Sequence, residues 1–242
     1  MGQKRTYRKR VAGQPGWSSF NVRYLQSDLW IQADLDARQR AETLLLEARR
    51  QLEIYALRHP AFMTAYSPMA FEPEAPEVVR WMLRASKAAQ VGPMASVAGA
   101  IARYVGEGLL AAGCTEVVVE NGGDLYLKAS RALLVGLLAG DSPLSGRMGL
   151  RIDPAQMPMG VATSSATVGH SWSQGMADAA CVLASDAALA DAVATAMGNM
   201  VREKADLEAA LQWALSIEGV LGGLVILGST LASAGSVELV RL

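Results

Sequence analysis

The chain has 242 residues and a net charge of only −1, with 51% apolar and 19% charged residues. That balance excludes an intrinsically disordered chain, and the near-neutral charge argues against nucleic acid or an acidic membrane surface as a partner. Because no apolar run reaches the roughly 18 residues that cross a bilayer, and the first residues lack a signal peptide's apolar core, we expect a cytoplasmic protein.

A cluster of basic residues without an acid opens the chain. It comprises Lys4, Arg5, Arg8, Lys9 and Arg10. We interpret residues 1–19 as a solvated basic tail, with an anion-binding arm as the alternative. Residues 20–242 are long enough for one large core and are expected to form a single domain.

The first predicted elements are a β-hairpin and a long helix. Residues 20–25 and 29–33 alternate apolar and polar side chains around a short polar turn, which is typical of a hairpin. In the segment that ends at His59, apolar residues recur at helical spacing with charges on the other face. Four prolines then predict a loop over residues 60–76.

Helices and short strands follow in the rest of the chain. Apolar spacing predicts helices over residues 77–89, 94–112 and 207–217, and a further helix that ends near Asn199. Short apolar runs predict strands at residues 116–120, 125–127, 133–138, 148–152, 179–184, 220–227 and 236–240.

One order of elements occurs twice. Helix, strand, turn and strand follow one another at residues 94–128 and again at 205–241, which indicates two pseudo-repeated halves around a layered core. Neighbouring strands joined by short turns pair antiparallel. The expected fold class is therefore α+β, with antiparallel sheets packed against helices, and not a doubly wound parallel sheet.

Polar residues are concentrated between residues 160 and 199. Asp191 and Thr195 are four residues apart on one predicted helix, so their side chains lie on the same face. A carboxylate with a hydroxyl suits a hard cation such as Mg²⁺, which takes oxygen ligands. On spacing alone, the favoured alternative is a solvent-facing acid beside an ordinary surface threonine.

The same region opens with a stretch, from Gly160, that we interpret as a hydroxyl-rich loop. It carries Thr163, Ser164, Ser165 and His170. Hydroxyls and free backbone amides can hold an anion, and His170 can orient or protonate a phosphate or a leaving group. A polar surface turn is an equally good interpretation.

A glycine-containing turn joins the strands predicted at residues 116–120 and 125–127. Asn121, Gly122, Gly123 and Asp124 are residue types that accept the positive φ of a hairpin turn. By itself this is an ordinary hairpin. The chain contains neither GxGxxG nor GxxxxGK[ST], the common phosphate-binding motifs.

Together these segments resemble the ApbE superfamily, whose best-known members are FAD:protein FMN transferases. Residues 117–124 (VVVENGGD) look like its strand and N-x-GGD segment, and residues 162–164 (ATS) are similar to its A-T-S-G turn. His170 falls where its H-x-x-DP-x-x-G segment begins. Residues 190–196 (ADAVATA) are close to its A-D-A-L-A-T-A helix, the most specific of these matches. The resemblance spans roughly residues 77–200.

The resemblance implies a site and a reaction. It implies that Asp191 and Thr195 ligate magnesium, and it leaves His170 as the candidate catalytic residue, acting as an acid, a base or an orienting group. The residues that would lie along the flavin nucleotide are Asn121, Gly122, Gly123, Asp124, Thr163, Ser164 and Ser165. It also implies Mg²⁺ and FAD as cofactors and an acceptor protein as a partner. A homo-oligomer is compatible with the apolar composition, but no residue pattern specifies one.

The chain also departs from the family pattern. The family's D-x-GG-x-AKG segment aligns with residues 92–99 (GPMASVAG), which lack its acid, its glycine pair and its lysine. The DP that follows the family histidine is absent after His170. Some tens of residues that the family has between the helices predicted here at residues 77–89 and 94–112 are absent as well. The lipoprotein signal of many members is missing as well, so we expect a shorter branch of the family.

Three hypotheses follow. The first is a magnesium-dependent flavin or nucleotide transferase or hydrolase. The second is a binding protein for another anionic or nucleotide-like ligand, without FMN transfer, which the missing lysine and DP favour. The third is a structural protein with a vestigial site, against which the retained hydroxyls and His170 argue. Whether the chain is an enzyme stays open, with a transferase as the leading hypothesis.

Overall fold

The computed structural model describes residues 16–165 and 175–242. Its helices are α1 (Arg38–Arg58), α2 (Glu77–Ala89), α3 (Val97–Ala111), α4 (Ala187–Met200) and α5 (Asp206–Leu215), with short 3-10 helices η2 (Pro60–Met63), η3 (Pro93–Ser96) and η4 (Pro154–Gln156). Its strands are β1 (Ser18–Tyr24), β2 (Ser27–Ala33), β3 (Val117–Asn121), β4 (Asp124–Lys128), β5 (Leu133–Gly136), β6 (Met148–Ile152), β7 (Met159–Ser164), β8 (Ala179–Ala184), β9 (Val220–Leu227), β10 (Thr230–Gly235) and β11 (Leu239–Arg241).

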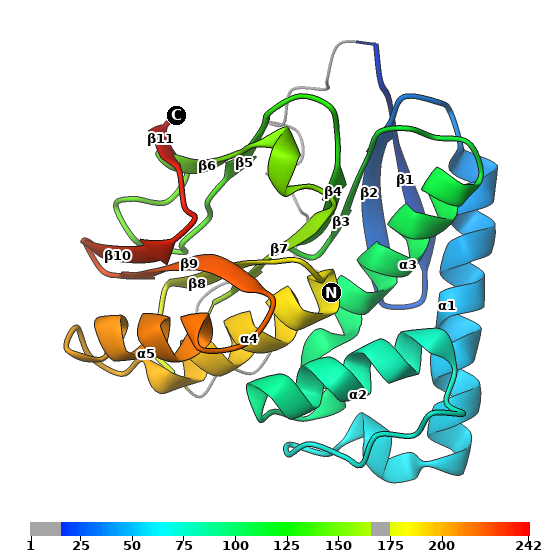
Figure 1. Ribbon diagram of the computed structural model, residues 1–242, viewed down its shortest axis with the longest axis horizontal. Coiled ribbons are helices and arrows are strands. Elements are labelled where there is room, and N and C mark those ends of the chain that lie inside the picture. Colours follow the sequence, from blue (N-terminus) through cyan, green and yellow to red (C-terminus); the bar gives the residue numbers. More distant parts are fainter. Residues whose placement is uncertain (1–15, 166–174) are drawn as a thin grey trace.

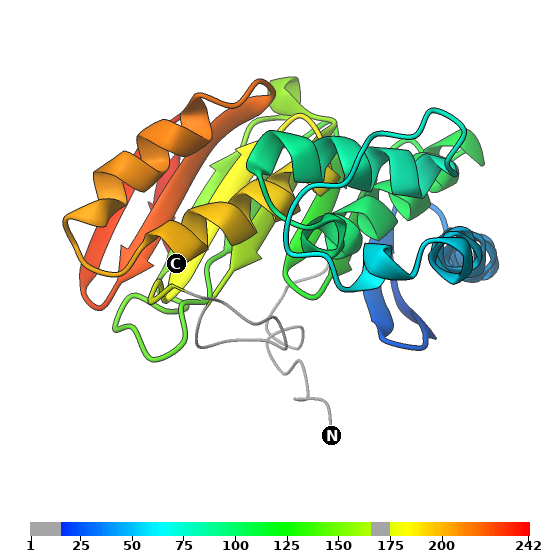
Figure 2. The ribbon, with the colours of Figure 1, turned by 90° about the horizontal axis from the view of Figure 1, so that it is seen from below.

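The strands form two antiparallel sheets. The large sheet has the order β1-β2-β3-β4-β7-β8-β9-β10, and the small one has the order β11-β6-β5. Helices α1 to α5 pack on one face of the large sheet, and the small sheet packs on its other face, so that two apolar cores are separated by the large sheet. Figure 1 shows these three layers, and Figure 2 shows the helices in front of the large sheet. The predicted α+β class with antiparallel sheets is confirmed.

Two predictions about strands were wrong. The segment read as a hydroxyl-rich loop from Gly160 begins inside β7, a central strand of the large sheet. The strand predicted at residues 236–240 does not close the second repeat. β10 pairs with β9 in that place, and β11 joins the small sheet instead. The predicted recurrence is therefore present as α3–β3–β4 and α5–β9–β10, with a different last strand.

The chain's first residues are only partly described. Most of the predicted basic tail lies outside the described residues, and β1 already begins at Ser18. Within residues 16–165 and 175–242, no helix combines the length and the apolar character that crossing a bilayer requires.

Glu116, the residue before β3, ties the start of the described chain to the large sheet. Its carboxylate accepts hydrogen bonds from Trp17 Nε1 at 3.0 Å, from Arg131 Nη2 at 3.1 Å, and from both the amide (2.7 Å) and the hydroxyl of Ser130. These donors lower the pKa of Glu116 to about 2, and the Ser130 hydroxyl has the largest effect. The ionised carboxylate therefore stabilises this end of β3.

We expect Glu116→Gln to lower the free energy of unfolding at neutral pH by about 2 kcal/mol, because an amide cannot accept from all of these donors. A carboxylate with a lowered folded-state pKa stabilises the fold above its unfolded pKa, near 4.5, and loses that contribution as the pH falls towards 2. Urea unfolding of both proteins should show a full difference at about pH 7 that shrinks below about pH 4.5. A difference that does not change with pH would contradict this.

Candidate functional site

Helix α4 presents one polar stripe on an otherwise buried surface. Along residues 187–198, all of which are described, every residue is buried except Asp191 and Thr195, which are half-buried. Asn199 continues the same face one turn later and is also half-buried. The rest of α4 is packed into the core on the helix side of the large sheet, so the orientation of the stripe is fixed by the fold.

Asp191 contacts the first turn of α3. Its Oδ2 accepts a hydrogen bond from the Gly99 amide at 2.9 Å, and the Ala98 amide also donates to this carboxylate. The first amides of a helix have no partner within the helix and carry partial positive charge, so they favour a carboxylate. Desolvation raises the pKa of Asp191 to about 7 against the effect of these amides, although part of the residue still reaches the surface.

The close approach of α3 to α4 depends on Gly99. A Cβ atom there would lie 2.1 Å from the carbonyl oxygen of Ala187 and 2.9 Å from the Cβ of Asp191. Small residues are frequent in this helix, a pattern compatible with close approach of either a ligand or another helix to its backbone. At Gly99 the neighbour is helix α4.

Asn121 holds the same turn of α3 from the sheet side. Its Nδ2 donates to the carbonyl oxygen of Ala98 at 3.1 Å. That carbonyl and the Gly99 amide belong to one peptide group, which is therefore fixed by Asn121 on one side and by Asp191 on the other. β3, α3 and α4 meet at this peptide.

The turn after Asn121 has the predicted geometry. Gly122 and Gly123 have φ of 73° and 110°, and the Gly123 amide donates to Glu120 Oε1 at 2.8 Å. Asp124 pairs with Asn121 across the turn and is buried. Because Asn121 bonds to α3, its partner Asp124 lies on the same helix-facing side of the sheet.

The hydroxyl residues of β7 alternate between the two faces of the sheet. Thr163 pairs with Cys181, and its hydroxyl bonds to that thiol, on the side of the small sheet. Ser164 faces the helices, where a Cβ on Gly198 would lie 3.7 Å from its Oγ. Ser165 is buried. Since successive side chains of a strand point to opposite faces, Thr163 and Ser164 do not face one common space.

Two further points concern the predicted site residues. His170 lies outside the described residues. The backbone amides of Ala98 and Gly99 could not be identified from the sequence as partners of Asp191. They lie in a run of small residues, and nothing in that run marks where the helix begins. Sequence reasoning also missed Asn199, whose four-residue spacing from Thr195 could have placed it on the stripe.

The donors around Asp191 fit a hard cation. Among the described residues, no group of three or more His, Cys, Asp or Glu side chains could hold a metal ion. The Asp191 carboxylate and the Thr195 hydroxyl are oxygen donors, and in the described part of the chain no basic side chain pairs with Asp191. Magnesium is commonly held by one or two carboxylates while water and phosphate oxygens complete its shell. The residues therefore fit Mg²⁺ if a phosphate-bearing ligand supplies further oxygens.

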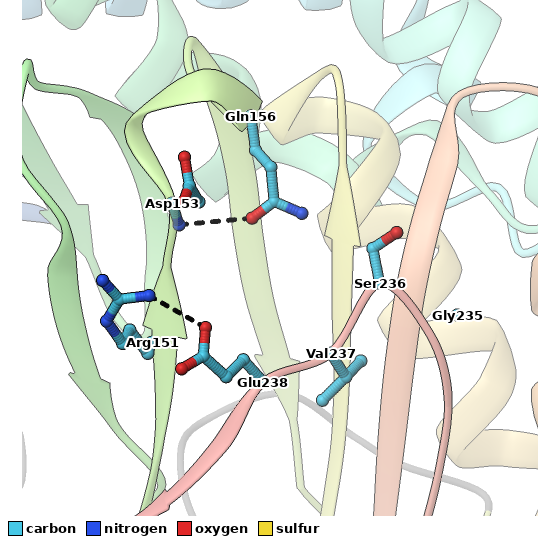
Figure 3. Close-up of a pocket in the computed structure, with 7 residues that line it drawn as sticks. All are labelled: Arg151, Asp153, Gln156, Gly235, Ser236, Val237 and Glu238. Carbon is cyan, nitrogen blue, oxygen red and sulfur yellow. Dashed lines mark hydrogen bonds and ion pairs between the residues drawn. The ribbon is translucent and has the colours of Figure 1, made fainter.

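A hollow of about 310 Å³ lies elsewhere, beside β6 and the segment before β11 (Figure 3). Arg151 Nη1 pairs there with Glu238 Oε2 at 3.0 Å, and Gln156 Oε1 accepts from the Asp153 amide at 3.3 Å. Because these groups already bond to one another, the hollow offers a ligand few unsatisfied partners.

One family model covers most of this chain. A family model described as AbpE bacteria matches residues 8–232. A UPF0280 protein of Methanocaldococcus jannaschii is 43% identical over 209 residues, or 84% of each chain, and one of Methanococcus aeolicus is 41% identical over 201 residues, or 81% of each.

Solved structures show the same fold. The flavinyl transferase ApbE of Pseudomonas stutzeri has a TM-score of 0.57 at 15% identity and covers 90% of this chain and 94% of its own. The ApbE protein of Thermotoga maritima has a TM-score of 0.60 at 14% identity, with coverages of 90% and 97%. At such low identity the likeness shows the fold alone.

Proposed function

Because the chain belongs to the family described as AbpE bacteria, a branch of the ApbE superfamily, we propose that it binds a flavin nucleotide and acts as a magnesium-dependent FMN transferase. Two similar structures are named as flavin transferases, of Pseudomonas stutzeri and Vibrio cholerae. The observation that carries the proposal is the polar stripe of α4, where Asp191 faces the first amides of α3.

In this proposal the residues around Asp191 hold the phosphates of FAD. Asp191 and Thr195 would hold Mg²⁺, which when bound would neutralise and polarise the pyrophosphate. The turn of Asn121, Gly122, Gly123 and Asp124 would lie along the nucleotide with Ser164 and Ser165. Thr163 points to the small sheet and would not contact a nucleotide held beside Asp191. His170 would orient a phosphate oxygen or take up a proton.

The proposed reaction exchanges the phosphoanhydride bond of FAD for a phosphate ester. The oxygen of an acceptor-protein hydroxyl forms a bond to the FMN phosphorus, and the bond from that phosphorus to the AMP oxygen breaks. The hydroxyl proton passes to a base, for which His170 is the candidate, and AMP leaves. Both the acceptor and the flavin are thus proposed partners.

A second function is supported by one segment in which the chain departs from the ApbE sequence pattern. Residues 92–99 lack the family's acid and lysine, and in this chain they form η3 and the start of α3. A site without these two charged groups is suited to holding an anionic ligand without transferring part of it. The alternative is therefore a binding protein for a nucleotide-like anion on the same fold.

Calorimetric titration of FAD with and without Mg²⁺ tests the proposal, followed by an assay for AMP release in the presence of hydroxyl-bearing acceptor peptides. For the transferase we expect magnesium-dependent FAD binding and AMP release. Magnesium-dependent binding without AMP release would favour the alternative. Absence of FAD binding under both conditions would contradict the flavin proposal.

A further inference from the structure

A second hollow lies on the outer side of α2, with a volume of about 490 Å³. It is lined by Phe71, Arg84, Lys87 and Ala88. The last three belong to the solvent-facing side of α2, whose other side packs into the core and against α4. The hollow is therefore separated from Asp191 by the body of α2, and it is open to solvent.

Two basic side chains face this hollow without an acidic partner. In the described residues, neither Arg84 nor Lys87 lies within ion-pair distance of a carboxylate, whereas Arg103 on α3 pairs with both Glu107 and Asp186. Arg84 and Lys87 are three residues apart, so they lie on one helix face. An anion in the hollow can thus approach two positive charges at once.

The opposite wall is apolar and held in place. The Arg84 guanidinium lies 4.9 Å from the centre of the Phe71 ring. The loop that carries Phe71 is fixed by Arg80, whose Nη1 donates to the Ala75 carbonyl at 2.8 Å, and by Glu72, whose Oε1 lies 3.6 Å from His59 Nδ1. Among the described residues Glu72 pairs with His59 and not with Arg84. The wall is therefore preformed.

We propose that this hollow binds a small organic anion that carries a phosphate or carboxylate group on a flat or apolar body. The anionic group pairs with Arg84 and Lys87, since a guanidinium presents a planar fork that matches both anions. The body of the ligand lies against Phe71 and Ala88, where it removes the apolar wall from water. The site is independent of the proposed flavin site.

Phenyl phosphate and benzoate are suitable probes, with benzyl alcohol as their neutral counterpart. Titration followed by ¹⁵N chemical shifts should show saturable movement of the amides of Phe71 and of residues 84–88 with at least one of the anions. Tighter binding of phenyl phosphate would assign the site to phosphate esters, and tighter binding of benzoate would assign it to carboxylates. Equal shifts with benzyl alcohol, or no shift with either anion, would overturn the proposal.

Two double variants test whether Arg84 and Lys87 are the residues that bind the anion. Arg84→Gln with Lys87→Gln should weaken anion binding by about 10-fold or more, because both ion-pairing groups are lost. Arg50→Gln with Arg58→Gln removes the same charge from the exposed side of α1 and should leave the affinity unchanged, as should Asp191→Asn. If the folded variant with Arg84→Gln and Lys87→Gln binds the probes as tightly as the parent chain, the proposal is wrong.

Discussion

Replacing Asp191 with asparagine is expected to weaken FAD binding in Mg²⁺ by about 100-fold or more, or about 2.7 kcal/mol. The substitution removes the negative charge that is proposed to hold the cation. It keeps a side-chain oxygen that can accept the Gly99 amide, which the Asp191 carboxylate now binds at 2.9 Å. The fold should therefore survive, and the loss should appear in the calorimetric titration only when Mg²⁺ is present.

A matched control is available at the start of α5. Asp206 also accepts two backbone amides, those of Arg202 at 2.8 Å and Glu203 at 2.9 Å, but it is not on the α4 stripe. Asp206→Asn should leave FAD affinity unchanged. If Asp191→Asn binds FAD in Mg²⁺ as tightly as the parent, Asp191 has only its structural contact with α3, and the metal site must be sought elsewhere.

The helices and the hairpin turn could be predicted because their signals are local. The apolar residues of α2 recur at helical spacing within thirteen residues, and Gly122 and Gly123 supply positive φ where the turn needs it. β10 carries no such signal, because its small side chains form a half-exposed edge strand. β7 was misread because consecutive hydroxyl residues such as Thr163, Ser164 and Ser165 also suit a turn. Its place in the sheet is decided by pairing with β4 and β8.

The candidate site was predictable only in part, because some of its contacts join segments that are far apart in the sequence. The spacing of Asp191 and Thr195 places them on one helix face whatever surrounds that helix. The partner of Asp191 is a backbone amide 92 residues earlier in the chain, and Asn121 meets its partner, the Ala98 carbonyl, across 23 residues. These contacts depend on how α3, α4 and β3 pack together. No residue pattern within one element encodes that packing.

The packing of α3 on α4 predicts a large loss of stability for Gly99→Ala. Alanine would favour the helix itself by about 1 kcal/mol over glycine. The added Cβ, however, would lie 2.1 Å from the Ala187 carbonyl oxygen, a backbone atom that cannot rotate away. We expect the free energy of unfolding to fall by about 3 kcal/mol, and the melting temperature by about 6–12 °C, because the two helices must move apart.

The control for this change is Gly108→Ala in the same helix. A Cβ at Gly108 would lie 2.5 Å from Cδ2 of Leu44, the end of a flexible side chain that can shift. That variant should remain within about 1 kcal/mol of the parent, since the gain in helix propensity offsets a local adjustment. Chemical denaturation of both variants decides the matter. If Gly99→Ala were as stable as Gly108→Ala, α3 and α4 would not be in backbone contact, and the contact of Asp191 with the Gly99 amide could not persist.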